Sequence, residues 1–261
     1  MNKKGLGILT RTLGDVCIGN TLSKGIKAKY PDIELDWIVE ARYKDILEGN
    51  PDIKNIITIE ETGKDWDKVL RMAACDGYDK VFMFQQVNSV DNMWHHNNKY
   101  RHSHLIDFYA RRCGITIPER RLYMYPDPND FIEMEKIIAN YDGKMVAMHT
   151  TSLVTAKDWL IERFNELADK IDDIGYTICQ VGTKQDKKID NSIDLRGELT
   201  LRQIAAFLSK CKCFIGIDSG ISYIAASQGI PVICIMGMSS PVTSGPIGSN
   251  VTFIEPQRPP E

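Results

Sequence analysis

Short apolar runs alternate with longer amphipathic segments along most of this 261-residue chain. The first run, residues 5–11, predicts a buried strand. The turn Thr12–Asp15 follows, and in residues 16–29 apolar side chains recur every four positions, as on one face of a helix. Strands that alternate with helices are typical of a parallel sheet, whose ligands bind at the carboxyl ends of the strands.

The same alternation continues to residue 84 and resumes after residue 128. Further strands are predicted at 33–40, 53–59, 80–84, 144–149, 176–181, 193–195, 213–217 and 230–236. Further helices are predicted at 41–48, 65–75, 131–140, 159–171, 200–209 and 221–228, with Thr200 as an N-cap. We interpret Pro126 to Asn129 as a linker. The predicted fold is α/β, with two Rossmann-like, doubly wound domains, 1–127 and 128–261, facing a cleft that would hold a ligand.

Composition and charge narrow the class of protein. Hydrophobic residues make up 43% and charged residues 26%, which is typical of a soluble globular chain. The net charge of −3 gives no overall attraction to nucleic acid or to an anionic membrane. No apolar run is long enough to span a membrane, and the start lacks the pattern of a signal peptide. Seven scattered cysteines without a C-x-x-C pair predict buried thiols in a reducing, cytoplasmic setting.

Residues 89–121 interrupt the alternation because they are polar, aromatic and basic. A helix is predicted at 102–113. Four of the five histidines fall between positions 95 and 104, but the His-His and His-x-His pairs are not completed by a carboxylate or cysteine in the pattern of a usual metal site, so we expect none. If this segment is functional, its basic residues bind an anionic acceptor; otherwise it is an ordinary solvated surface. The candidate acceptor-binding residues are Arg42, Lys44, Lys99, Arg101 and His102.

The turn Asp218-Ser219-Gly220 lies between the strand 213–217 and a helix. At a helix N-terminus, unpaired N–H groups and the helix dipole favour an anion. Ser219 and Ser222 add hydroxyl groups, and Gly220 allows close approach of a ligand. The pattern therefore indicates a phosphate site, although an Asp/Ser N-cap on an ordinary helix explains it as well.

A longer pattern contains this turn. The order Asp-Ser-Gly-x-x-(aromatic)-x-Ala-Ala, then Gly-x-Pro, an apolar strand and a loop ending in Gly245-Pro246 resembles the nucleotide-sugar motif of glycosyltransferase family 9, the ADP-heptose:lipopolysaccharide heptosyltransferases. Further stretches resemble the family at 14–31, 48–51, 157–164 and 195–201, so that the resemblance extends over about residues 5–250. Tyr223 departs from the pattern, because the family usually has His there. The C-terminal helices that brace the family's two domains are expected to be short.

The resemblance assigns roles to residues that spacing alone leaves open. It makes Asp15 the catalytic base, whereas the residues alone favour an N-cap of the first helix. It makes Lys157 the cation that stabilises the leaving diphosphate. The candidate donor-binding residues are Gly14, Thr150, Thr151, Lys157, Gly182, Asp218, Ser219, Gly220, Ile221, Ser222 and Tyr223. We expect Asp218 to orient the turn or to bind a sugar hydroxyl.

The resemblance implies a two-domain (GT-B) enzyme. We predict an inverting, metal-independent glycosyltransferase that moves a heptose-like sugar from a nucleoside-diphosphate donor, ADP-linked in the family, to a hydroxyl of a lipopolysaccharide-type glycan. No cofactor is expected, and no Asp-x-Asp metal motif occurs. Peripheral contact with a membrane stays open. Two alternatives remain: a nucleic-acid acceptor with a modified base, disfavoured by the net charge, and a non-catalytic module that binds sugar nucleotides.

Overall fold

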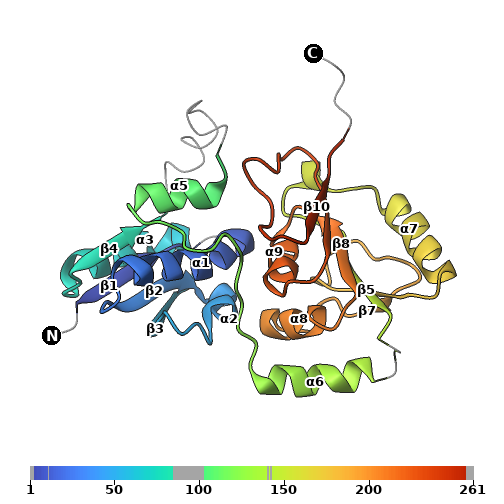
Figure 1. The fold of residues 1–261 in the computed structure, drawn as a ribbon, viewed down its shortest axis with the longest axis horizontal. Helices are drawn as coiled ribbons and strands as arrows, with labels where there is room; N and C mark the ends of the chain where they lie inside the picture. Colours follow the sequence, from blue (N-terminus) through green and yellow to red (C-terminus); the bar gives the residue numbers. More distant parts are fainter. Residues whose placement is uncertain (1–2, 11, 85–102, 140, 142, 257–261) are drawn as a thin grey trace, which may run out of the picture. The chain divides into compact units, whose positions relative to one another are not determined.

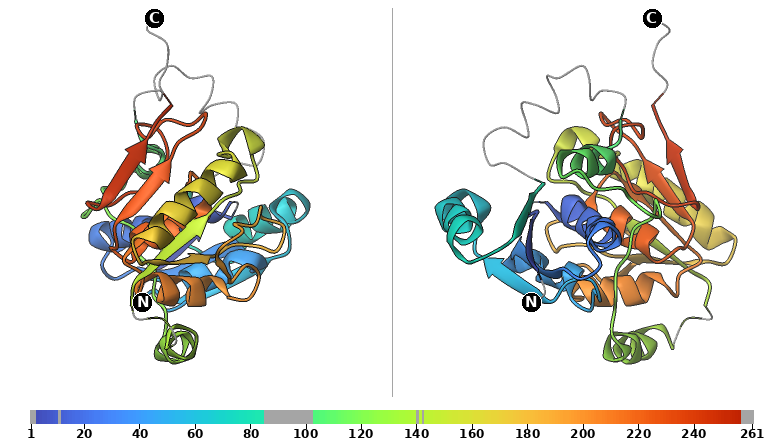
Figure 2. Two further views of the ribbon diagram at one scale, coloured as in Figure 1. Left: turned by 90° about the vertical axis from the view of Figure 1, so that its right-hand side faces the viewer. Right: turned by 60° about the vertical axis from the view of Figure 1, so that its left-hand side comes forward.

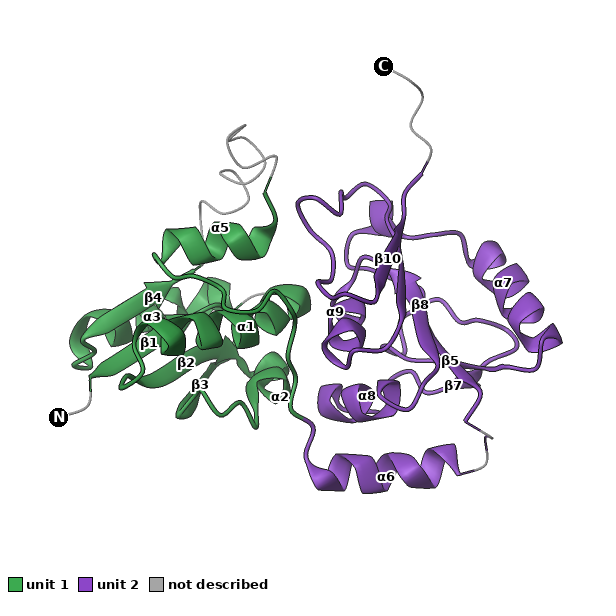
Figure 3. Cartoon of the chain, viewed as in Figure 1, with its two compact units in different colours: residues 1–125 green, residues 126–261 purple. Residues whose placement is uncertain are grey.

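The computed structural model describes residues 3–10, 12–84, 103–139, 141 and 143–256. Contacts divide the chain into two compact units, residues 1–125 (unit 1) and residues 126–261 (unit 2) (Figure 3). The sequence placed its boundary after residue 127. Among the described residues, no helix combines the length and apolar character needed to cross a membrane.

The described strands of unit 1 form one parallel sheet in the order β3-β2-β1-β4 (Figure 1). They are β1 (Lys4–Ile8), β2 (Glu34–Glu40), β3 (Asn55–Ile59) and β4 (Lys80–Met83). The helical segments are α1 (Leu13–Lys29), η1 (Ala41–Tyr43), α2 (Lys44–Leu47), α3 (Thr62–Cys75) and α5 (Leu105–Arg112).

The two faces of this sheet bury different side chains. On one face Leu6, Ile8 and Ile38 pack with Val69 of α3. On the other, Gly7 lies against the Trp37 ring, where a Cβ would come within 2.3 Å of a ring carbon. Burial on both faces is typical of parallel strands and explains their nearly continuous apolar runs.

The described strands of unit 2 form a second parallel sheet, in the order β10-β9-β8-β5-β6-β7. They are β5 (Met145–His149), β6 (Thr177–Gln180), β7 (Ile193–Asp194), β8 (Cys213–Ile217), β9 (Val232–Ile235) and β10 (Val251–Ile254). The helical segments are α6 (Pro128–Ile138), η3 (Thr155–Lys157), α7 (Ile161–Asp173), α8 (Leu201–Leu208) and α9 (Gly220–Ser227). Numbered within the unit, this is the Rossmann order 3-2-1-4-5-6 read backwards.

Helices cover both faces of the unit 2 sheet. Helix α7 lies on one face, and α8 and α9 lie together on the other (Figures 1 and 2). Phe164 and Ala168 of α7 pack on Val146, Ile178 and Ile217 of the sheet. This doubly wound arrangement of parallel strands confirms the predicted α/β class.

Two local predictions were wrong at their boundaries, and one strand was missed. Helix α1 begins at Leu13 with Thr12 as its N-cap, so Asp15 lies in the first turn of the helix and is not its cap. The segment interpreted as a linker contains the start of α6, because Asp127 caps that helix with both halves of a capping box. Strand β10 was not predicted.

Candidate functional site

The carboxyl ends of β5 and β8 mark the point in unit 2 where the strand order reverses. These two strands are hydrogen-bonded neighbours, with His149 opposite Gly216. The chain leaves β5 toward α7 and leaves β8 toward α9, which lie on opposite faces of the sheet. Ligands of doubly wound folds bind in the crevice that such a reversal creates.

Lys157 and Asp218 meet at this edge. The Lys157 ammonium lies 2.7 Å from Oδ2 of Asp218. The Asp218 side chain is only 3% exposed and that of Lys157 24% exposed. Within the described part of the chain, this is the one bond recorded for the ammonium, which has three N–H donors. Asp218 therefore fixes the position of a cation that still has donors for a ligand.

Helix α9 begins directly beside this pair. The hydroxyl of Ser219, the residue before the helix, lies 3.0 Å from Nδ1 of His149. For the described residues, no hydrogen bond is recorded from the backbone N–H groups of Gly220 and Ile221. Unpaired N–H groups at a helix N-terminus next to a lysine suit an anion such as a phosphate.

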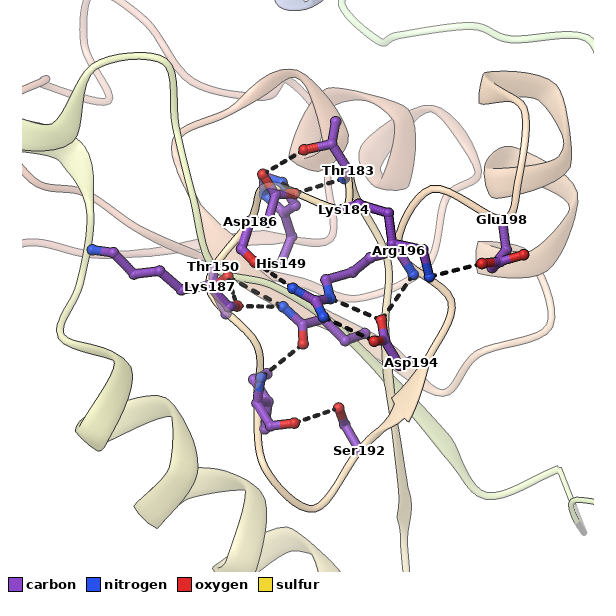
Figure 4. A network of polar contacts seen from close by, with 12 residues as sticks. His149, Thr150, Thr183, Lys184, Asp186, Lys187, Ser192, Asp194, Arg196 and Glu198 are labelled. Atoms are coloured by element: carbon purple, nitrogen blue, oxygen red, sulfur yellow. Dashed lines mark hydrogen bonds and ion pairs between the residues drawn. The ribbon is translucent and has the colours of Figure 1, made fainter.

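His149 belongs to a polar network that extends into the loop between β6 and β7 (Figure 4). Its Nε2 lies 3.1 Å from Oδ2 of Asp186. Asp186 also accepts hydrogen bonds from the backbone N–H and the hydroxyl of Thr183, at 2.8 and 2.9 Å. Burial raises the pKa of Asp186, but the hydrogen bonds from His149 and Thr183 outweigh it and lower the pKa overall. The Asp186 carboxylate is therefore ionised at neutral pH.

Arg196 supports the same loop. Its guanidinium makes two hydrogen bonds of 2.8 Å to the carboxylate of Asp194 and donates a third to the backbone carbonyl of Asp186. These bonds from Arg196 hold the pKa of Asp194 well below its usual range. The arginine thus links the end of β7 to the loop that presents Asp186 to His149.

Some predicted donor-binding side chains have other partners. Thr150 is completely buried, and its hydroxyl donates a hydrogen bond of 2.6 Å to the carbonyl of Lys187. Ser222 is also completely buried, and its hydroxyl donates a hydrogen bond of 2.6 Å to the carbonyl of Ser219. Thr151 is half-buried and accepts from the backbone N–H of Lys187.

Tyr223 holds the loop that ends the family motif. Its side chain is buried, and its hydroxyl accepts a hydrogen bond of 2.9 Å from the backbone N–H of Gly245. In this structure the Tyr223 hydroxyl is therefore hydrogen-bonded to the protein backbone. Gly182 lies close to the same site. A Cβ there would come within 2.1 Å of the Asp186 carboxylate, and the backbone φ of +135° also favours glycine.

In unit 1, Asp15 follows β1, at the strand edge where that sheet also reverses. Its carboxylate accepts hydrogen bonds from the Thr12 hydroxyl at 2.8 Å and from the Tyr109 hydroxyl at 3.2 Å. Gly14 precedes it in the same turn of α1. The two hydroxyl donors and the helix N-terminus all favour the ionised carboxylate, which is the form that a general base requires.

The candidate acceptor-binding cations differ in their surroundings. Arg42 is largely exposed and pairs with the buried carboxylate of Glu40, which also accepts from the N–H of Thr62 at 2.9 Å. Lys44 forms an ion pair of 2.7 Å with Glu48, one helical turn away. The remaining three candidates, Lys99, Arg101 and His102, lie outside the described residues.

The structure shows contacts between site residues that their spacing in the sequence could not predict. Among those predicted, it places Lys157 and Asp218 in contact and Ser219 beside them. It adds His149 and Asp186, which sequence reasoning missed. His149 is the last residue of an apolar strand, which was a usable signal, whereas Asp186 lies in a polar loop with nothing to distinguish it. Within the described residues, no three His, Cys, Asp or Glu side chains gather as metal ligands would.

Comparison with known proteins gives the family. The model of glycosyltransferase family 9 (heptosyltransferase) matches residues 119–261, more than half of the chain. The lipopolysaccharide core heptosyltransferase OpsX of Haemophilus influenzae is 24% identical over an alignment 274 positions long, gaps included, which covers 90% of this chain and 79% of that protein.

Two solved structures share the fold. A glycosyl transferase family 9 protein from Veillonella parvula has a TM-score of 0.82 at 20% identity, covering 100% of this chain and 89% of the other. The ADP-heptose lipopolysaccharide heptosyltransferase II of E. coli has a TM-score of 0.78 at 19% identity, covering 96% and 90%. The fold is thus that of the GT-B heptosyltransferase structures. The chain belongs to glycosyltransferase family 9 and is a glycosyltransferase, which confirms the resemblance noted in the sequence.

Proposed function

We propose that this protein is an inverting, metal-independent glycosyltransferase. It moves a heptose-like sugar from an ADP-linked donor to a hydroxyl of a lipopolysaccharide-type glycan. The family membership and the relatives, a core heptosyltransferase and an ADP-heptose heptosyltransferase, support this substrate class. In this scheme unit 2 binds the donor and unit 1 binds the acceptor.

One observation carries the donor site. Lys157 is held by Asp218 beside the N-terminus of α9, where two backbone N–H groups have no recorded partner in the described chain. As the sugar leaves, negative charge grows on the diphosphate. A fixed ammonium and oriented N–H groups stabilise that charge without having to reorganise. Here Asp218 is a positioning residue, since an anionic carboxylate would repel the phosphates.

Asp15 is the proposed base. Its carboxylate removes the proton from the acceptor hydroxyl as the oxygen attacks the anomeric carbon from the face opposite the diphosphate, which inverts that carbon. The hydrogen bonds from Thr12 and Tyr109 orient the carboxylate and keep it ionised. Because the leaving diphosphate is neutralised by Lys157 and by α9, this route needs no metal ion.

The acceptor is proposed to be an anionic glycan that reaches basic residues of unit 1. Arg42 is the best-defined of these, because its exposed guanidinium is bound by the buried carboxylate of Glu40, which Thr62 in turn holds through a hydrogen bond. Lys44 lies on the next helical segment, and Lys99, Arg101 and His102 complete the proposed set. A glycolipid acceptor implies work at the cytoplasmic side of a membrane, with peripheral contact.

The test is a binding and turnover series. Thermal-shift measurements with ADP-, GDP-, UDP- and TDP-sugars, and with the free diphosphates, should show stabilisation by the ADP compounds, which is lost in Lys157→Ala. Transfer to a heptose-free lipopolysaccharide core should then proceed in EDTA. A stabilisation by another nucleotide would reassign the donor, and activity that disappears in EDTA would contradict the metal-independent route.

A further inference from the structure

His149 is a buried histidine that the proposed reaction does not use. It is the last residue of β5 and is 5% exposed. Both of its ring nitrogens have polar partners from other segments: Asp186 at Nε2, 3.1 Å away, and the Ser219 hydroxyl at Nδ1, 3.0 Å away. The ring therefore connects a buried carboxylate with the hydroxyl at the start of α9.

The chemistry of these partners fixes the direction of the hydrogen bonds. An ionised carboxylate only accepts, so Nε2 must carry a hydrogen that it donates to Asp186. In a neutral ring Nδ1 then has no hydrogen and accepts the hydroxyl hydrogen of Ser219. That hydroxyl has a single hydrogen, which is consequently directed at His149 and not at a ligand beside α9.

Protonation of the ring reverses the second bond. With a hydrogen on Nδ1, the imidazolium donates to the Ser219 oxygen, and the Ser219 hydrogen becomes available to a phosphate oxygen. We propose that the chain Asp186–His149–Ser219 couples binding of the donor diphosphate to uptake of one proton by His149, which turns the Ser219 hydroxyl toward the diphosphate. This inference rests on the proposed function, because it takes the diphosphate to bind at the N-terminus of α9.

The Asp186 carboxylate lies 3.1 Å from Nε2, so it accepts a hydrogen bond from the ring in either protonation state. Four ion pairs lie on the described elements around the ring: Lys157 with Asp218, Lys187 with Asp158, Lys184 with Glu198, and Arg196 with Asp194.

The experiment uses ADP-glucose and the full-length protein. Both phosphates of this nucleotide sugar are diesters and do not titrate between pH 6 and 8, so any proton taken up belongs to the protein. Calorimetry in buffers of different ionisation enthalpy should show uptake of up to about one proton near pH 7.5, and affinity should rise by at most about tenfold per unit of decreasing pH. Histidine ¹⁵N spectra should show the neutral Nε2–H form of His149 in the free protein and the doubly protonated form with ADP-glucose bound.

Two variants and an internal control separate this coupling from a structural role. Ser219→Ala and His149→Gln should both bind ADP-glucose more weakly and without proton uptake, while thermal melting checks that each is folded. His104, a buried histidine of unit 1 whose Nδ1 accepts from the backbone N–H of Ile106, should keep its protonation state on binding.

Each result decides a different question. Binding of ADP-glucose with His149 still neutral and no proton uptake would overturn the coupling and leave the donor site in place. Proton uptake that persists in Ser219→Ala would also overturn it. A folded protein that binds neither ADP-glucose nor ADP would overturn the proposed ADP-linked donor, and the coupling with it.

Discussion

The ammonium of Lys157 lies 2.7 Å from the carboxylate of Asp218, although 61 residues separate them in the sequence. The parallel neighbours β5 and β8 create this contact, because each residue follows the carboxyl end of its strand. The ammonium is the counter-ion of the buried carboxylate, and the pair lies at the edge of the sheet where α9 begins.

Lys157→Ala is expected to weaken binding of the ADP-linked donor by about 10- to 100-fold, because the variant loses at least one charge-assisted hydrogen bond to the diphosphate. It should also lower the free energy of unfolding by about 1–3 kcal/mol, because Asp218 is left buried without its partner. Calorimetry and urea unfolding measure the two effects. Lys54→Ala, which removes an ion pair of 2.5 Å with Glu34 in unit 1, is the control and should leave donor affinity unchanged. Equal donor affinity in Lys157→Ala and wild type would contradict the assignment of Lys157 to the donor site.

Asp15→Asn is expected to reduce the transfer rate by at least about 100-fold, because the amide cannot accept the proton of the acceptor hydroxyl. The dissociation constant of the donor should not change. The matched control is Asp65→Asn: Asp65 occupies the first turn of α3, as Asp15 does in α1, but among the described residues its carboxylate accepts hydrogen bonds only from the backbone N–H groups of Glu60 and Glu61 and it has no proposed role. A rate comparable to wild type in Asp15→Asn would require another base.

Tyr109→Phe should retain the ring contacts with Phe84 and Phe108 while removing the hydrogen bond to Asp15. The loss of a donor makes the ionised carboxylate less stable, so the acid limb of the pH–rate profile should move to higher pH. We expect a fall in rate of about tenfold, near the net value of one hydrogen bond to a charged group, with donor affinity unchanged. Tyr78→Phe breaks a similar bond of 3.0 Å, to Asp36, and should leave the profile in place. Identical profiles for the two variants would exclude a positioning role for Tyr109.

Gly237→Ala tests the support beneath Lys157. A Cβ at position 237 would come within 2.8 Å of both the carbonyl oxygen of Ala156 and the Cα of Lys157. Because both atoms belong to the backbone, the turn that carries Lys157 must shift, and we expect a loss of about 1–3 kcal/mol in stability together with weaker donor binding. Gly63→Ala in α3 has open space around the new methyl group and should instead stabilise by up to about 1 kcal/mol. Unchanged donor affinity in Gly237→Ala would show that the turn tolerates the shift.

Acid should lower the stability of unit 2, in part because Asp194 becomes protonated. Hydrogen bonds from Arg196 hold its pKa well below the usual range, whereas in the unfolded chain a carboxyl of this type titrates near about 3.9. A depressed pKa contributes stability above the unfolded value, and the contribution is lost as the pH falls toward the folded value. Asp194→Asn should therefore lower stability at pH 7 by about 1–3 kcal/mol and reduce the further loss between pH 5 and 3. Urea midpoints measured across this range would contradict the prediction if both proteins lost stability in parallel.

The sequence by itself determined the local elements and the class of fold. Apolar runs fixed the strands because each parallel strand is buried on both faces, and alternation with helices fixed the parallel arrangement. Local capping was equally readable: Thr200 caps α8 through the capping box that it forms with Gln203. The turn at Asp218 and the motif around it were sufficient to identify the family, because these features depend on residues close together in the chain.

Only the tertiary structure decided which side chains meet. The order of the strands placed Lys157 on Asp218 and connected His149 to Asp186, contacts that no spacing predicts. Burial also decided between neighbours of similar chemistry, since Thr150 points inward to a backbone carbonyl although its sequence position suited a ligand. Strand β10 was missed because it is four residues long and alternates between half-buried and exposed positions, so its pairing with β9 defines it. Short-range patterns set conformation, whereas the site depends on long-range packing that the pattern of single residues does not encode.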